Sequence, residues 1–153
     1  MAIERNDLNL LEFLDKHPPK FLTENPKDLM FEEIKWNHEV LNALLEKRSE
    51  LVKYIIENKK IDISDLNVAL AFSIEHNRDL VELLIQKGAN DWTLAVESAG
   101  KIGDISLMEY FASKGPVNWE NVQRRIRRAM YMDGKLTPEQ KEAVNQFIKM
   151  QLN

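Results

Sequence analysis

One stretch near the C-terminal end concentrates the side chains best suited to bind an anion. Residues 119–132 hold four arginines within five positions, followed by a tyrosine: Arg124, Arg125, Arg127, Arg128 and Tyr131. Arginine is always charged, and its planar guanidinium can hold a carboxylate or a phosphate through two hydrogen bonds. On a helix that buries Val122 and Ile126, positions 124, 127, 128 and 131 share the opposite side and position 125 flanks it.

Two interpretations of this cluster stay open. The first is a solvated helix face, which Glu120 would help to stabilise from four residues before Arg124. The second is a surface that binds carboxylates or phosphates. Four arginines without a lysine favour binding, because a face that serves only solubility usually mixes both residue types.

Two tryptophans form a second candidate. Trp92 and Trp119 lie 27 residues apart, and Ile63 precedes Trp92 by 29 residues, so the three should form an apolar row. The row could seal the connections between structural units. Alternatively, it could bind a partner, since aromatic side chains often dominate the energy of an interface.

Metal and cofactor chemistry find little support. The three histidines, His17, His38 and His76, fall in three different segments. His38-Glu39 begins like a zinc-protease helix, but the second histidine is absent, and a metal needs several converging ligands. The sequence therefore predicts no metal and no cofactor.

Catalysis finds equally little support. The carboxylates of Asp62, Asp65 and Asp91 stand where helices begin, so we expect them to cap free backbone N–H groups. The glycines are isolated, and no serine has the context of a nucleophile elbow. We predict that the chain has no catalytic residue and is not an enzyme.

The composition is that of a soluble globular domain, with 44% hydrophobic and 30% charged residues in 153. There is no cysteine, which fits a reducing compartment and predicts a cytoplasmic protein. The first residues are polar and acidic, unlike a signal peptide. No apolar run approaches the ~18 residues of a membrane span, so no membrane association is expected.

Charge is distributed unevenly. Residues 119–153 carry seven Lys/Arg against four Asp/Glu, a net +3, whereas residues 1–118 carry fourteen against twenty-one, a net −7. The acidic body would repel a long polyanion, which disfavours nucleic acid as a partner. A protein with an acidic patch fits the basic end better.

Nearly every segment is predicted to be helical from its apolar spacing. The expected helices cover residues 8–14, 31–46, 49–58, 65–77, 79–87, 91–101, 105–114, 119–132 and 138–150. The last begins with a capping box in which Thr137 and Gln140 flank Pro138. Turns at Asn77, Gly103 and Gly134 suit a left-handed C-cap and pair the helices into hairpins.

The chain repeats itself. Aligning Leu51, Leu80 and Leu107 superimposes three helical segments at spacings of 29 and 27 residues. Hairpins of this size cannot bury both of their faces alone, so they must stack. The sequence predicts that the shared core contains Leu80, Val81, Leu84, Leu107, Tyr110 and Phe111.

The middle two units resemble ankyrin repeats. One has Ser73 near the end of its inner helix, a turn at Asn77, an outer helix Leu80-Val-Glu-Leu-Leu84, and Gly88-Ala-Asn90. The next places Ala99, Gly103 and Leu107-Met-Glu-Tyr-Phe111 in the corresponding positions. The likeness extends more loosely over about 120 residues, from 34 to 150. It implies stacked helical hairpins and a role in binding proteins.

The departures from the family are specific. The family's Thr-Pro-Leu-His motif is Val68-Ala-Leu-Ala71 in one unit and Leu94-Ala-Val-Glu97 in the next. The family's period of ~33 residues is shortened between Gly88 and Leu94, where the resemblance places projecting β-hairpins. We therefore expect stunted hairpins and a recognition surface on the inner helices.

Together these observations predict an all-α fold, a short ankyrin-like solenoid of stacked helical hairpins. Residues 1–30 should form an N-terminal capping helix and linker, and residues 31–153 the repeats with a C-terminal capping hairpin. The predicted function is a protein–protein interaction module, an adaptor or an inhibitor. An anion or nucleic-acid binder is the alternative. A divergent array of this kind fits a viral or bacterial protein that acts in the host cytoplasm.

Overall fold

The computed structural model describes residues 49–153, and every regular element in this part of the chain is helical. The elements are α3 (Ser49–Asn58), α4 (Ile63–His76), the short 3₁₀ helix η3 (Arg78–Leu80), α5 (Val81–Lys87), α6 (Trp92–Lys101), α7 (Ile105–Ala112), α8 (Trp119–Asp133) and α9 (Pro138–Leu152). The all-helical prediction is confirmed over this range. The expected helices at 8–14 and 31–46, the linker at 18–30, and His17 and His38 lie outside the described residues.

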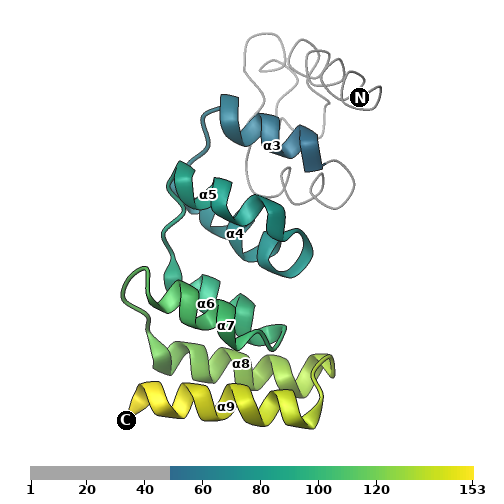
Figure 1. Ribbon diagram of the computed structural model, residues 1–153, viewed down its shortest axis with the longest axis vertical. Helices are drawn as coiled ribbons and strands as arrows, with labels where there is room; N and C mark the ends of the chain where they lie inside the picture. The colour runs from purple at the N-terminus through teal and green to yellow at the C-terminus, as the bar shows by residue number, and fades with distance from the viewer. Residues whose placement is uncertain (1–48) are drawn as a thin grey trace, which may run out of the picture.

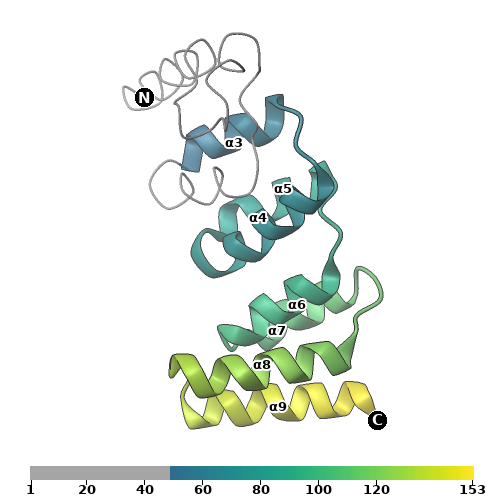
Figure 2. The same ribbon diagram turned by 180° about the vertical axis from the view of Figure 1, so that it is seen from behind.

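The helices pair into antiparallel hairpins, α4 with α5, α6 with α7, and α8 with α9. Neighbouring hairpins meet mainly through their first helices, so that α4, α6 and α8 follow one another down the molecule (Figures 1 and 2). The second helices pack on the same stack, with α3 against α5 and α7 against α9.

The core runs through the middle of this stack. Helix α6 is buried continuously from Ala95 to Gly100, because α4, α7 and α8 all contact it. The expected core residues Leu80, Val81, Leu84 and Phe111 are buried, whereas Leu107 and Tyr110 are half-buried at its edge. The apolar stripes of the second helices therefore do face the neighbouring hairpins.

Side-chain caps fix several helix starts. The carboxylate of Asp91 accepts a hydrogen bond from the Leu94 amide at 3.0 Å. The capping box of Thr137 and Gln140 before α9 is complete, as the sequence predicts. For Asp62 the capping prediction is wrong, because it precedes α4 without a side-chain cap bond. Asp65 lies in the first turn of α4, which begins at Ile63.

The turns inside the hairpins are of two kinds. Gly103 and Gly134 have φ values of 74° and 57°, the left-handed geometry that glycine adopts without strain. Asn77 is the C-cap of α4, but the predicted left-handed geometry is wrong there, since its φ is −155°. Its side chain instead accepts a hydrogen bond from the Asp79 amide, which starts η3 directly after α4.

Polar side chains hold the connections between hairpins. The Asn67 side-chain oxygen in α4 accepts hydrogen bonds from the backbone amides of Asn90 and Asp91, at 2.7 and 3.0 Å. The Thr93 hydroxyl in α6 accepts one from the Asn118 amide at 3.0 Å. In both cases, a side chain of the first helix of a hairpin holds the segment that follows the second helix of the same hairpin.

Two polar contacts join the hairpin of α5 to that of α7, and we call them the polar seam. Arg78 forms an ion pair of 2.7 Å with Asp104, the residue that caps α7. The Tyr110 hydroxyl donates a hydrogen bond to the Glu82 carboxylate. That bond is also the main reason why the pKa of Tyr110 is raised.

Candidate functional site

Helix α8 presents its arginines to solvent because its apolar stripe holds the other side in the core. Val122 and Ile126 are fully buried, and Met130 is nearly so. The predicted binding residues Arg124, Arg125, Arg127, Arg128 and Tyr131 are all exposed, and 85% of the Tyr131 surface is accessible.

The four arginines are nevertheless not equivalent. Arg125 reaches back to α6, where its Nη1 lies 3.3 Å from Glu97 Oε2. Arg124 donates a hydrogen bond to the Asn121 side chain within its own helix. Arg127 lines a hollow between α8 and α9. Within residues 49–153, neither Arg127 nor Arg128 has a carboxylate within ion-pair distance, so these two charges are available to a ligand.

Glu97 explains the separate position of Arg125. Its side chain is only 3% exposed, and this burial raises the pKa of Glu97, because the charged carboxylate loses its hydration. Arg125 and Lys101 oppose that shift by stabilising the carboxylate. Arg125 is therefore mainly the partner of an acid in the core, and Arg124, Arg127 and Arg128 remain for an external ligand.

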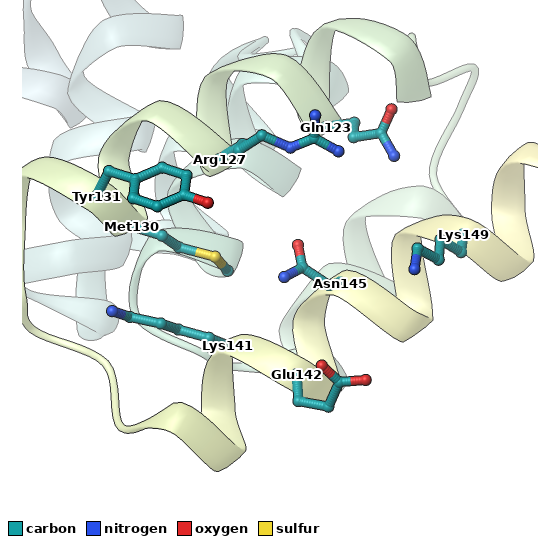
Figure 3. A pocket seen from close by; sticks show the side chains of 8 residues that line it. All are labelled: Gln123, Arg127, Met130, Tyr131, Lys141, Glu142, Asn145 and Lys149. Atoms are coloured by element: carbon teal, nitrogen blue, oxygen red, sulfur yellow. The ribbon is translucent and has the colours of Figure 1, made fainter.

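A hollow of about 350 Å³ lies between α8 and α9 (Figure 3). We call it the α8–α9 groove. Its lining residues come from both helices: Gln123, Arg127, Met130, Tyr131, Lys141, Glu142, Asn145 and Lys149. Met130, from the edge of the core, supplies the apolar part of the lining.

The groove is bordered by two rows of side chains at helical i, i+4, i+8 spacing. Gln123, Arg127 and Tyr131 form the row on α8, and Lys141, Asn145 and Lys149 form the row on α9. Because the helices run antiparallel, Gln123 and Lys149 share one end of the groove, and Tyr131 and Lys141 share the other (Figure 3). Arg127 and Asn145 occupy the middle.

The groove is cationic. Arg127, Lys141 and Lys149 contribute three positive charges, and Glu142 contributes one negative charge, which leaves a net +2. The Glu142 carboxylate accepts a hydrogen bond from the Gln146 side chain at 3.1 Å, one turn further along α9. The sequence analysis did not single out the two lysines, although their spacing along α9 places both on one side of that helix.

The tryptophans pack within hairpins. Trp92 of α6 lies against Phe111 of α7, with ring centroids 6.5 Å apart and planes inclined by 18°. Trp119 of α8 meets Phe147 of α9 edge to face at 5.7 Å. Both tryptophans are half-buried, whereas Ile63 is 53% exposed. This packing favours the sealing role over a free aromatic binding row.

Gly115 shows how tightly Trp92 is packed. A Cβ atom added to Gly115 would lie 2.5 Å from the indole Cδ1 of Trp92. The indole is therefore covered by the chain between α7 and α8, and only part of its surface could meet a partner.

Between residues 49 and 153, no group of three or more His, Asp or Glu side chains is placed to hold a metal ion. Over the same residues, no helix combines the length and the apolar character needed to cross a membrane.

Comparisons with known proteins identify no family for this chain. No protein-family model, no curated protein sequence and no solved structure matches the chain at a significant level.

Proposed function

We propose that this chain is a protein–protein interaction module, an adaptor or an inhibitor, built as a short ankyrin-like solenoid. The stacking of α4, α6 and α8, the short glycine turns of two hairpins and the strandless connection from Gly88 to Asp91 support that architecture. Stacked arrays present extended surfaces, which serve to bind partners.

The observation that carries this proposal is the exposed arginine face of α8, formed by Arg124, Arg127 and Arg128. None of these three guanidinium groups has a carboxylate partner within residues 49–153, in a chain whose net charge is −4. An acidic patch on a partner protein would provide the missing carboxylates. The absence of cysteine from the sequence fits a cytoplasmic setting, including that of a host cell for a viral or bacterial effector.

The test is a charge reversal on the full chain. Arg124→Glu combined with Arg128→Glu should leave the fold intact, since exposed charges contribute little to stability. It should abolish capture of those partners that the unchanged chain retains from lysate. The matched control is Lys53→Glu with Lys60→Glu, which changes the net charge equally at two exposed residues outside α8.

Rescue makes the test specific. A captured protein should regain binding to the Arg124→Glu, Arg128→Glu variant when acidic residues in its own patch are changed to arginine. If the control variant loses the same partners, net charge alone governs capture and the proposed surface is wrong.

Nucleic acid is the competing ligand for the same arginines. The acidic remainder of the chain disfavours it, because a long polyanion would be repelled outside the arginine face. Recovery of RNA in place of protein, lost in the double variant and kept in the control, would replace the interaction module with a nucleic-acid binder.

A further inference from the structure

We infer that the α8–α9 groove binds an extended acidic segment of the partner protein whose carboxylates stand at alternating positions. This inference rests on the proposed function and adds the conformation and the charge spacing of the recognised segment.

The three cations of the groove stand at evenly spaced helix positions along its length. Lys141 and Lys149 are eight residues apart on α9, which corresponds to ~12 Å at the rise of an α-helix. Arg127 projects from α8 near Asn145, midway between them (Figure 3). Because arginine and lysine side chains are long and rotatable, a ligand that lies along the groove can meet a positive charge about every 6 Å.

An extended peptide has nearly the same repeat. Alternate side chains of a β-like segment point to one side and recur every ~6.6 Å. Three acidic residues at positions i, i+2 and i+4 would thus place their carboxylates near Lys141, Arg127 and Lys149 in turn. A run of consecutive acidic residues would direct part of its charge away from the groove.

The polar residues of the groove suit a peptide backbone. An extended segment carries N–H and C=O groups that need partners. The amide side chains of Gln123 and Asn145 offer both donors and acceptors, one from each helix. Met130 and the exposed Tyr131 provide apolar surface for side chains or backbone between the carboxylates.

The size and charge of the groove favour a short segment over a long polyanion. A volume of about 350 Å³ lies near the lower end of the range for ligand pockets. The net +2 of the groove is local, whereas residues 1–118 carry a net −7. A short acidic segment gains the local attraction without running over the acidic part of the chain.

The inference can be tested with labelled synthetic peptides and the full chain. The probe carries three glutamates that alternate with serines. Its two controls carry the same three glutamates in one block, or three glutamines in place of the glutamates. We expect the alternating peptide to bind about fivefold more tightly than the block peptide, since only its carboxylates match the cation spacing. The glutamine peptide should not bind.

Variants then assign the binding to the groove. Lys141→Gln with Lys149→Gln should weaken binding of the alternating peptide about tenfold, as expected when two charge pairs are lost. The matched control is Lys53→Gln with Lys60→Gln, which removes two exposed lysines that do not line the groove. It should change the affinity less than about twofold. Unchanged helical circular dichroism confirms that both variants fold.

Three results would overturn the inference. Equal affinity for the block peptide would show that the groove does not distinguish how the carboxylates of the peptide are spaced. An equal loss in the Lys53→Gln, Lys60→Gln control would show attraction to the net charge of the chain as a whole. Tighter binding of a single-stranded RNA oligonucleotide that depends on Lys141 and Lys149 would assign the groove to phosphates.

The same experiments separate this inference from the proposed function. If no peptide binds while an acidic partner is still captured through Arg124 and Arg128, the groove inference is wrong and the interaction module stands. If the alternating peptide binds but no partner depends on Arg124 and Arg128, the groove stands and the proposed arginine surface is wrong.

Discussion

Glu97 connects the interior of the stack to the arginine face. It lies in the continuously buried part of α6, and Arg125, which is 60% exposed on its side chain, covers it from α8. The charged form of this acid is destabilised by burial and stabilised by the nearby cations Arg125 and Lys101. Its ionisation should therefore be visible in the stability of the whole chain.

We expect Glu97 to make stability fall as pH rises above the ordinary range of a glutamate. Burial raises its folded-state pKa above the ordinary value of 4.5, so the folded chain binds this proton more tightly than the unfolded chain does. The resulting stabilisation is complete below the unfolded pKa and is lost as pH rises through the raised folded pKa. Glu97→Gln should remove that part of the pH dependence in urea unfolding measured across a pH series. An identical pH profile in the variant would contradict the raised pKa.

Arg125 should act in the opposite sense. Arg125→Gln removes a cation that lowers the pKa of Glu97, so the pKa should rise further and the loss of stability should extend to higher pH. Side-chain carboxyl titration by nuclear magnetic resonance measures this directly. A pKa that stays the same would show that the 3.3 Å pair contributes nothing in solution.

Leu84 tests the repeat register at the level of a single residue. It is fully buried in α5, so Leu84→Ala should lower the free energy of unfolding by about 2–5 kcal/mol, as core truncations do. Gln86→Ala, at an exposed position of the same helix, should change it by less than about 0.5 kcal/mol. Equal denaturation midpoints for the two variants would show that Leu84 does not lie on the buried side of α5.

Between elements, α6 and α8 pack closely at Gly100. A Cβ atom added to Gly100 would lie 2.2 Å from Ile126 Cδ1, and Ile126 is fully buried. These two helices therefore meet at a position where α6 has no side chain. The contact brings Arg125 of α8 within reach of Glu97.

Gly100→Ala should consequently destabilise the chain by about 1–3 kcal/mol through overpacking, less the ~1 kcal/mol by which alanine favours a helix. Adding Ile126→Val removes the clashing methyl and should recover most of the loss. Denaturation of the two single variants and the double variant gives the coupling energy. Additive effects would show that α6 and α8 do not approach one another at this point.

Local patterns in the sequence predict which residues are exposed, but they do not predict which helices pack together. Apolar spacing along α8 is local information, and it predicts the exposure of Arg124, Arg127 and Arg128. The pairing of Arg125 with Glu97 joins residues 28 positions apart, so it depends on how α8 packs on α6. The α8–α9 groove likewise exists only through the packing of two helices, which no local pattern contains.

Helix ends show the same limit on a smaller scale. The capping box at Thr137 is complete within four residues and was predicted. The extended geometry of Asn77 was not predicted, because it depends on η3 beginning immediately after α4. A preference for asparagine in left-handed turns was overridden by its role in starting the next helix.

At the scale of the whole molecule, the uneven charge should control association. Binding to an acidic partner should weaken as salt rises from about 0.05 to 0.5 M, since the screening length falls below ~10 Å over this range. The association rate should respond more than the dissociation rate, because distant charges act mainly on encounter. Stopped-flow measurements at several salt concentrations test this, and rates that do not vary with salt would exclude steering by the basic end.

The polar seam between α5 and α7 also bears on how the array can bend. Between these two hairpins, the first helices α4 and α6 are held together by packing. The second helices are bridged by the Arg78–Asp104 ion pair and by the hydrogen bond from Tyr110 to Glu82. Ion pairs and exposed hydrogen bonds open at a lower free-energy cost than a packed core. The seam would therefore part first, and the array would bend about the line where α4 meets α6. The shape of the surface offered to a partner would then not be fixed, because it would depend on whether these two polar contacts are closed or open.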